Sequence, residues 1–375
     1  MIYLDYSATT PVDERVLDSF NKACLDYPGN PNSIHSLGVK SNELISAATN
    51  QIKDILKTSS HEVIYTSGAS ESNNLAIKGI AYKYKNRGKH IITTNYEHSS
   101  IYGPLSFLQK EGFEVDFVST DEFGVVDIEN LKSLIREDTI LVSITSVNSE
   151  IGIKNPVEEI GKLLRDYPKI FFHVDMTQSI GKYHIDLSNI DLISMSAHKI
   201  FGLKGIGLLL KKENMTLEPL IHGGKSTTVY RSGTPALPLI VSVSKALRLI
   251  YENISENYNN VTRLNNLLRN KLKDITDIYI NSNDKCSPYV LNLSVIGVKP
   301  ETLVHALEEY DIYVSTQTAC ASTTVLSKAV LSLTNSEERA KSSIRISLSY
   351  KTTEEEILKF VDIFENCVNK LRGLR

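Results

Sequence analysis

The stretch DLISMSAHKIFGLKG, residues 191–205, predicts a buried strand that ends in a turn carrying a lysine. Its apolar half, residues 192–195, has the composition of a buried strand, and Lys199 follows after a short polar turn. Apolar neighbours would remove water from this amine, and desolvation lowers the pKa of a lysine, so a neutral nucleophile becomes available for a carbonyl group. A surface lysine in a strand-to-loop turn explains the stretch equally well, and the rest of the chain has to decide.

Six other segments have the apolar composition of strands and lie on both sides of this stretch. The seven strand candidates are 63–66, 90–93, 114–118, 140–145, 170–174, 192–195 and 206–210. Helical patterns separate most of them, and helix candidates at 14–27 and 36–57 precede them. This alternation predicts an α/β fold with a mostly parallel sheet covered on both faces, with ligands outside the carboxyl ends of its strands.

The remaining segments predict a second, smaller domain. Residues 212–238 form a long irregular segment, and loops of that length are usually functional. A helical run from 239 to about 275 follows it, and the chain beyond has the pattern of a small α+β domain. Because 375 residues favour two domains over one, we expect a large domain at 13–250 and a small domain made of 1–12 and 251–375.

Composition excludes several classes of partner. The net charge of -3 and the pI near 6.3 provide no basic field for a polyanion, so nucleic acid and anionic membranes are not expected as partners. No apolar run is long enough for a membrane helix, and the start of the chain lacks the pattern of a signal peptide. We therefore expect a cytoplasmic protein.

The four cysteines, Cys24, Cys286, Cys320 and Cys367, do not form a disulfide or zinc pattern. They are scattered and include no CxxC pair, so no metal site is expected. Cys24 and Cys367 lie within helical patterns, and we expect them to be small buried hydrophobic residues.

Polar clusters follow five of the strand candidates, as an α/β ligand site requires. They are TSGASE, TNYEH, SVNSE, DMTQS and SAHK. In the first cluster a strand opens directly into a helix, and free N–H groups at a helix start bind phosphate, to which Ser70 can add a hydroxyl. Taken alone, this cluster is more simply explained as an ordinary helix cap.

Asp175 and Gln178 suggest which ligand occupies the site. Asp175 follows an apolar run, and a buried carboxylate needs a cationic partner, which a protonated pyridine nitrogen supplies. Gln178 can donate to a phenolate oxygen of the same ligand, whereas a helix cap is the structural alternative for Asp175. With Lys199 for an aldehyde and the helix start for a phosphate, the set indicates pyridoxal 5′-phosphate. His98 can stack on the ring or transfer protons, although a lone loop histidine is more often structural.

Eight motifs run in order along the chain: YLDYSATTP, GNPNSIH, TSGASESNNLAIKG, EHSSI, HVDMTQSIGK, SAHKIFGLKGIG, YRSGTP and SSIRISLSYKTTEEEI. Together they resemble the cysteine desulfurase family, class V pyridoxal phosphate enzymes, from about residue 2 to residue 371. The resemblance implies aminotransferase fold type I, with a seven-stranded sheet in the large domain, and a homodimer.

The resemblance also implies a role for each matching position. Lys199 would bond to the cofactor aldehyde and later transfer protons, while His98 would stack on the ring. Asp175 would pair with the ring nitrogen and Gln178 with the phenolic oxygen. The phosphate would be held by Ala69, Ser70, Ser196 and His198 and, from the second subunit, by Thr234. Arg345 would bind the substrate carboxylate with its forked guanidinium, and a salt bridge at a strand edge is the alternative.

Cys320, in VSTQTACASTT, matches the nucleophile of the family. Its thiolate would attack the sulfur of a substrate cysteine, leaving a persulfide on Cys320 and releasing alanine. A cysteine among small polar residues of a loop is exposed enough to react and to deliver sulfur elsewhere. An unreactive loop cysteine is the alternative.

Several departures from the family pattern lie around the substrate and the dimer-facing segment. Ser149 stands where the family has a second Asn, and Gln317 and Thr318 replace residues of the usual GSAC loop. Lys225 stands where a third Gly is common. The groups expected to hold the cofactor are retained, so the cofactor assignment is less affected than the rate or the acceptor.

The sequence thus predicts a homodimeric, pyridoxal-phosphate-dependent cysteine desulfurase that converts L-cysteine to L-alanine. The persulfide sulfur would pass to an acceptor such as an iron–sulfur scaffold or a tRNA-thiolation protein. One alternative is another reaction on the same scaffold, such as that of a selenocysteine lyase or another class V enzyme. A second is a protein that binds the cofactor but mainly serves as a sulfur-transfer partner with little activity.

Overall fold

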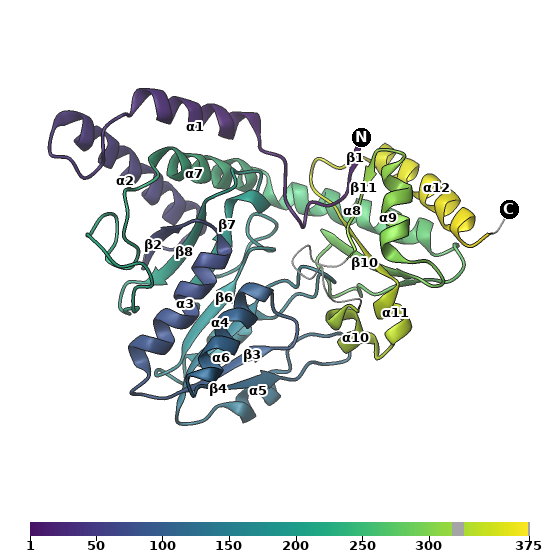
Figure 1. Cartoon of the computed structure of the whole chain (residues 1–375), viewed down its shortest axis with the longest axis horizontal. Coiled ribbons are helices and arrows are strands. Elements are labelled where there is room, and N and C mark those ends of the chain that lie inside the picture. The colour runs from purple at the N-terminus through teal and green to yellow at the C-terminus, as the bar shows by residue number, and fades with distance from the viewer. Residues whose placement is uncertain (317–325, 374–375) are drawn as a thin grey trace.

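The computed structural model describes residues 1–316 and 326–373, and its secondary structure falls into two groups that lie side by side (Figure 1). The larger group contains a seven-stranded sheet and the first seven helices. The smaller contains a three-stranded sheet and the later helices, and the N-terminus lies on its side of the molecule. The division at residues 13–250 remains a prediction.

The seven predicted strands all form, each within two residues of its expected bounds. They are β2 (His61–Thr66), β3 (His90–Thr94), β4 (Glu114–Val118), β5 (Thr139–Thr145), β6 (Phe171–Asp175), β7 (Leu192–Ser196) and β8 (Gly207–Lys212). Their order in the sheet is β2-β8-β7-β6-β5-β3-β4; β8 pairs antiparallel with both β2 and β7, and the other adjacent strands pair in parallel. The predicted α/β fold with a mostly parallel sheet is therefore confirmed.

Helices cover both faces of this sheet, which explains why its central strands are apolar throughout. They are α1 (Glu14–Asp26), α2 (Ser36–Leu56), α3 (Ala69–Tyr84), α4 (Ser99–Lys110), α5 (Ile128–Leu134), α6 (Val157–Leu164) and α7 (Leu237–Tyr251). One core joins α1, α2, α6 and α7 to one face. A second core joins α3 and α4 to the other, with Ile77, Ile80 and Leu105 against Leu141 and Leu209.

The smaller group has its own core around an antiparallel sheet of order β12-β10-β9. Its strands are β9 (Ile278–Ile280), β10 (Val290–Val295) and β12 (Ser343–Ser347). Its helices are α8 (Ile254–Leu272), α9 (Pro300–Glu308), α10 (Lys328–Thr334), α11 (Glu337–Lys341) and α12 (Glu354–Leu371). A two-residue strand at the N-terminus, β1 (Ile2–Tyr3), pairs in parallel with β11 (Ile312–Tyr313).

The predicted continuous helical run from residue 239 is wrong in one respect, because it contains two helices. α7 ends at Tyr251 and α8 begins at Ile254, with Asn253 outside the helical region at φ -131° and ψ 32°. The break has a packing reason: α7 contributes to the core of the large sheet, and α8 to the core of the small one. Hydrophobic periodicity on either side does not reveal which core each half joins.

The N-terminal segment crosses between the two cores and so becomes part of the site between them. Leu4 belongs to the small core, whereas Val16 belongs to the large one. On the way, the Ser7 N–H donates to Ser347 Oγ at 2.9 Å and the Thr10 N–H donates to the His198 carbonyl at 2.8 Å.

Within the described part of the chain, no helix combines the length and apolar character needed to cross a membrane.

Candidate active site

A cavity of about 520 Å³ lies at the carboxyl ends of the strands of the large sheet. This volume is within the usual range for small-ligand sites. All five polar clusters predicted from the sequence contribute to its wall. Its lining includes Ala69, Ser70, His98, Asp175, Gln178, Ser196, His198, Lys199 and Arg345, nine of the predicted site residues.

The start of α3 forms one end of the cavity and suits a phosphate. The helix begins at Ala69 directly after β2, and its N-cap, Gly68, provides no side-chain hydrogen bond. The first N–H groups of a helix have no partner within it and point beyond its end. Gly207 permits this arrangement, because a Cβ there would lie 2.6 Å from the backbone of Gly68. The alternative of an ordinary side-chain cap is therefore not what the structure shows.

Asp175 is buried at the end of β6 and is held by two donors. The Asn73 side-chain amide donates to Oδ2 at 2.8 Å, and the Thr177 N–H donates to Oδ1 at 2.9 Å. The same Asn73 nitrogen also donates to Ser100 Oγ at 2.8 Å. Asn73 therefore links the Asp175 carboxylate to Ser100, which in turn contacts His98.

His98 caps α4 and is kept neutral by its surroundings. Its Nδ1 accepts from the Ser100 N–H at 3.1 Å and lies 2.8 Å from Ser100 Oγ. Burial lowers the pKa of His98, and the positive charge of Lys199 acts in the same direction, against the raising effect of the Asp175 carboxylate. Because Nδ1 is an acceptor here, the proton of the neutral ring is on Nε2.

Lys199 lies in a short 3₁₀ turn, Ala197–Lys199, and its amine reaches the N-terminal segment. Nζ donates to the Ala8 carbonyl at 2.6 Å and also to the Ser7 carbonyl. His198 next to it has a pKa lowered to about 4, first by burial and then by the charges of Lys199 and Lys204. The Lys199 side chain is thus directed into the cavity, which the simple surface-turn interpretation does not explain.

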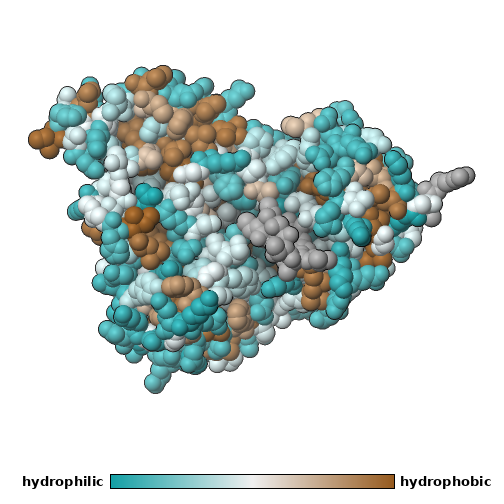
Figure 2. All heavy atoms as spheres, in the orientation of Figure 1, coloured by the Kyte–Doolittle hydropathy of each residue, from teal (hydrophilic) through white to brown (hydrophobic). Residues whose placement is uncertain are grey.

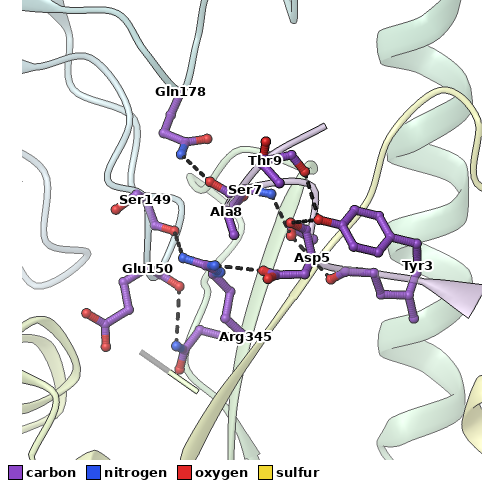
Figure 3. A network of polar contacts seen from close by, with 12 residues as sticks. Tyr3, Asp5, Ser7, Ala8, Thr9, Ser149, Glu150, Gln178 and Arg345 are labelled. Atoms are coloured by element: carbon purple, nitrogen blue, oxygen red, sulfur yellow. Dashed lines mark hydrogen bonds and ion pairs between the residues drawn. The ribbon is translucent and has the colours of Figure 1, made fainter. Parts of the chain in front are cut away.

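Gln178 is held at both ends of its amide. Its Nε2 donates to the Ser7 carbonyl at 3.0 Å, and its Oε1 accepts from Lys182 Nζ at 3.0 Å. Figure 3 shows Gln178 and the N-terminal residues converging on the same region. One carbonyl oxygen, that of Ser7, therefore accepts from both Gln178 and Lys199.

Arg345 in β12 both lines the cavity and forms the salt bridge given as its alternative. Nη2 lies 2.8 Å from Asp5 Oδ1, and Nη1 donates to the Ser149 carbonyl at 3.1 Å (Figure 3). Its Nε is buried without a hydrogen-bond partner in the described residues. The guanidinium is 2% exposed and is therefore fixed in direction.

One predicted site residue lies outside the cavity, and another is not among the described residues. Thr234 is exposed and does not line it. Cys320 falls within 317–325, outside the described residues, as do Gln317 and Thr318. Among the other departures from the family pattern, Ser149 lines the cavity and Lys225 is exposed.

The residues that support the cavity from behind, or from distant parts of the chain, were not predicted from the sequence. Ser7 and Ala8 contact Lys199 although about 190 residues separate them, and no local pattern reports such a contact. Asn73 and Lys182 lie inside quoted motifs, TSGASESNN and HVDMTQSIGK, but only the three-dimensional contacts give them a role.

Comparison with known proteins places the chain in a family. The model of the aminotransferase class-V family matches residues 2–360. Cysteine desulfurase IscS of Glaesserella parasuis is 43% identical, over 100% of this chain and 94% of that protein. A solved NifS-like protein superposes with a TM-score of 0.92 at 34% identity, covering 98% and 99% of the two chains. SspA in complex with cysteine gives a TM-score of 0.82 at 32% identity, covering 94% and 100%.

These matches extend over nearly the whole chain and agree with the arrangement of the sheet. Class V aminotransferases depend on pyridoxal phosphate, and their fold is consistent with aminotransferase fold type I. The chain belongs to the class V aminotransferase family.

Proposed function

We propose that this protein is a pyridoxal-phosphate-dependent cysteine desulfurase. One observation carries the proposal: a single cavity presents an amine, a buried carboxylate, an uncapped helix start and a fixed guanidinium, in a chain whose full-length relatives are named cysteine desulfurase. Each of these groups matches a different part of the cofactor or the substrate.

The residues of the cavity fit the cofactor. Lys199 would hold its aldehyde, Asp175 its ring nitrogen, and the start of α3 with Ser196 and His198 its phosphate. His98 would stack on the ring, and its neutral form avoids a second positive charge beside a protonated pyridine. When bound, the cofactor supplies a ring that withdraws electrons from a substrate amino acid.

The Ser7 carbonyl supports the assignment of Gln178. This oxygen accepts hydrogen bonds from both Lys199 and Gln178, which shows that the two donors reach one acceptor. A phenolate oxygen next to an aldehyde is an acceptor of the same kind. When the cofactor binds, Gln178 would therefore exchange the Ser7 carbonyl for that oxygen, and Lys199 would exchange it for the aldehyde.

Arg345 would hold the carboxylate of L-cysteine. Its guanidinium is fixed by Asp5 and the Ser149 carbonyl, and the Nε atom has no partner in the described residues. A similar structure, SspA, is described in complex with cysteine. Fixing the carboxylate would orient the substrate amine toward Lys199 in the same cavity.

Cys320 would take the sulfur. Its thiolate attacks the sulfur of the substrate, the carbon–sulfur bond breaks, and its electron pair remains on carbon, which takes up a proton from Lys199 to give alanine. The persulfide on Cys320 then passes sulfur to an iron–sulfur scaffold or a tRNA-thiolation protein. We place this reaction in the cytoplasm.

The working unit would be a homodimer, with Thr234 completing the partner's phosphate site. In the single chain Thr234 is exposed and lies outside its own cavity. Exposed apolar side chains of the N-terminal helices and the loop between them, including Leu25 and Ile34, provide a surface for a second copy. Figure 2 shows apolar residues gathered over this end of the molecule.

The proposal is tested by supplying L-cysteine and a thiol reductant to the purified protein loaded with pyridoxal phosphate. We expect equal amounts of alanine and sulfide, and neither from Lys199→Ala, while the exposed-site control Lys169→Ala keeps the wild-type rate. Cofactor binding without alanine would contradict desulfurase activity and favour the role of a sulfur-transfer partner. Turnover of selenocysteine but not cysteine would favour a selenocysteine lyase.

A further inference from the structure

Lys182 is a buried lysine behind the wall of the cavity, and its main contact is a predicted cofactor ligand. It is 9% exposed, and Nζ donates to Gln178 Oε1 at 3.0 Å. The side chain lies over the Tyr289 ring, with Nζ 5.4 Å from the ring centroid. Lysine is rarely buried to this degree without a partner, so this position needs an explanation.

The local backbone brings Lys182 and Gln178 to the same side of a turn. After β6 the chain forms one helical turn, in which the Ile180 N–H donates to the Met176 carbonyl at 2.9 Å. Gln178 lies within this turn, and Lys182 follows it, with the Lys182 N–H donating to the Ser179 carbonyl at 3.0 Å. Gly181 then adopts a left-handed conformation at φ +70°, and a Cβ there would lie 2.7 Å from the Ile250 side chain.

Lys182 can act as a hydrogen-bond donor whether its amine is charged or neutral. Burial, followed by the charges of Lys199 and Arg345, lowers the pKa of Lys182 to about 7. Its amine carries N–H groups in both the charged and the neutral form. The Gln178 oxygen is therefore the acceptor within reach, and the hydrogen bond persists on either side of this pKa.

The two contacts of Gln178 together define which way its amide points. The Ser7 carbonyl can only accept, so it requires the NH₂ end, and Lys182 donates to the oxygen end. Without Lys182 the buried oxygen would lose its donor, and an unpaired buried polar atom is unfavourable. The Ser7 carbonyl alone would then hold the NH₂ end, and once a cofactor oxygen replaced that carbonyl, the amide could rotate its oxygen toward the cavity, where it would repel a phenolate.

We propose that Lys182 is a positioning residue that holds the Gln178 amide with its NH₂ group directed into the cavity. The proposal rests on the proposed function, because the group that Gln178 would address is the phenolic oxygen of pyridoxal phosphate. Lys182 itself would not touch the cofactor, since it does not line the cavity.

The test is a titration of the apoprotein with pyridoxal phosphate, in which both affinity and the absorption spectrum of the bound cofactor are recorded. Lys182→Met should bind about tenfold more weakly, as expected for a lost hydrogen bond to a charged group. Gln178→Ala should show the same loss and the same spectral shift, and the double variant should be no weaker than Gln178→Ala alone. Lys162→Met, at an exposed position of α6, should match the wild type.

A second variant separates hydrogen bonding from packing. Lys182→Gln retains an N–H donor and should bind the cofactor more tightly than Lys182→Met. Wild-type affinity in Lys182→Met, fully additive losses in the double variant, or no advantage of Gln over Met would each overturn the inference. If the wild type itself does not bind pyridoxal phosphate, the proposed function fails first, and the inference fails with it.

Discussion

At the scale of single residues, Arg345 is held in place before any substrate arrives. Its pair with Asp5 and its bond to the Ser149 carbonyl occupy two of its nitrogens, while Nε remains without a partner in the described residues. A buried arginine so arranged can serve the fold, the substrate or both. A substitution by lysine keeps the positive charge but removes the forked guanidinium, and so distinguishes these roles.

We predict that Arg345→Lys raises the KM for L-cysteine at least about tenfold, because a lysine cannot form the bidentate contact with a carboxylate. The affinity for pyridoxal phosphate should change little. Steady-state kinetics and a cofactor titration measure the two effects separately. An unchanged KM together with a lower unfolding temperature would show that Arg345 is structural only.

Glu97, between the two cavity residues Tyr96 and His98, should make stability depend on pH. Burial raises the pKa of Glu97 to about 8, and nearby Asp175 adds to the shift. The folded protein therefore retains a proton that the unfolded chain releases above the ordinary glutamate pKa of 4.5. The free energy of unfolding must fall as pH rises between these two values.

Glu97→Gln removes this ionisation and should become more stable than the wild type as pH rises from about 5 to 8, by an amount on the order of a few kcal/mol. Urea unfolding across this range measures the gap. Glu122→Gln, at an exposed position, should show no such trend. A gap that stays constant with pH would contradict the shifted pKa of Glu97.

At the scale of elements, the polar turn after β5 joins the two groups of secondary structure. Ser327 Oγ donates to Glu150 and also caps α10 by accepting from the Val330 N–H at 3.0 Å. On the other side of this turn, the Ser149 carbonyl accepts from Arg345. One serine thus supports a helix start and a buried carboxylate at once.

Ser327→Ala should therefore lower the free energy of unfolding by about 2 kcal/mol, since it removes a helix cap and the donor of a buried carboxylate. Ser336 caps α11, and its Oγ accepts from the Arg339 N–H at 3.3 Å. The matched variant Ser336→Ala removes only this cap and should lower the free energy of unfolding by less. Chemical unfolding compares the two. Equal losses would show that the bond to Glu150 contributes nothing.

Elements that depend on neighbouring residues in the sequence were predicted well, and those that depend on contacts between distant residues were predicted poorly. All seven strands of the large sheet, and the polar clusters at their ends, follow from runs of apolar residues and turn residues. The division of the helical run near Asn253 depends on which core each half joins, so periodicity alone did not show it. The contact of Ser7 with Lys199 depends on the path of the whole chain.

At the scale of the whole molecule, the cavity lies where the two cores meet and is crossed by the N-terminal segment. Asp5 and Ser7 come from that segment, Arg345 from the small sheet, and Lys199 from the turn that follows β7 of the large sheet. The proposed homodimer would add Thr234 of the second subunit. Cofactor binding should therefore depend on assembly as well as on the fold of one chain.

We predict that Ile34→Asp weakens the dimer, because Ile34 is 99% exposed in the single chain and a carboxylate cannot be buried there without cost. Sedimentation velocity should show a shift toward monomer, accompanied by weaker binding of pyridoxal phosphate. Tyr310→Asp, at another exposed position after α9, should leave both unchanged. A monomeric wild type with full cofactor affinity would contradict the dimeric site.

The most direct test of the central claim is mass spectrometry of the cofactor-loaded protein after addition of L-cysteine without reductant. Added sulfur is located by peptide mapping, and alanine is quantified in the same sample. Desulfurase activity should leave one additional sulfur atom on Cys320 and a matching amount of alanine, with both lost in Lys199→Ala and the sulfur lost in Cys320→Ser. Alanine without sulfur on Cys320, or neither product in protein that carries the cofactor, would contradict it.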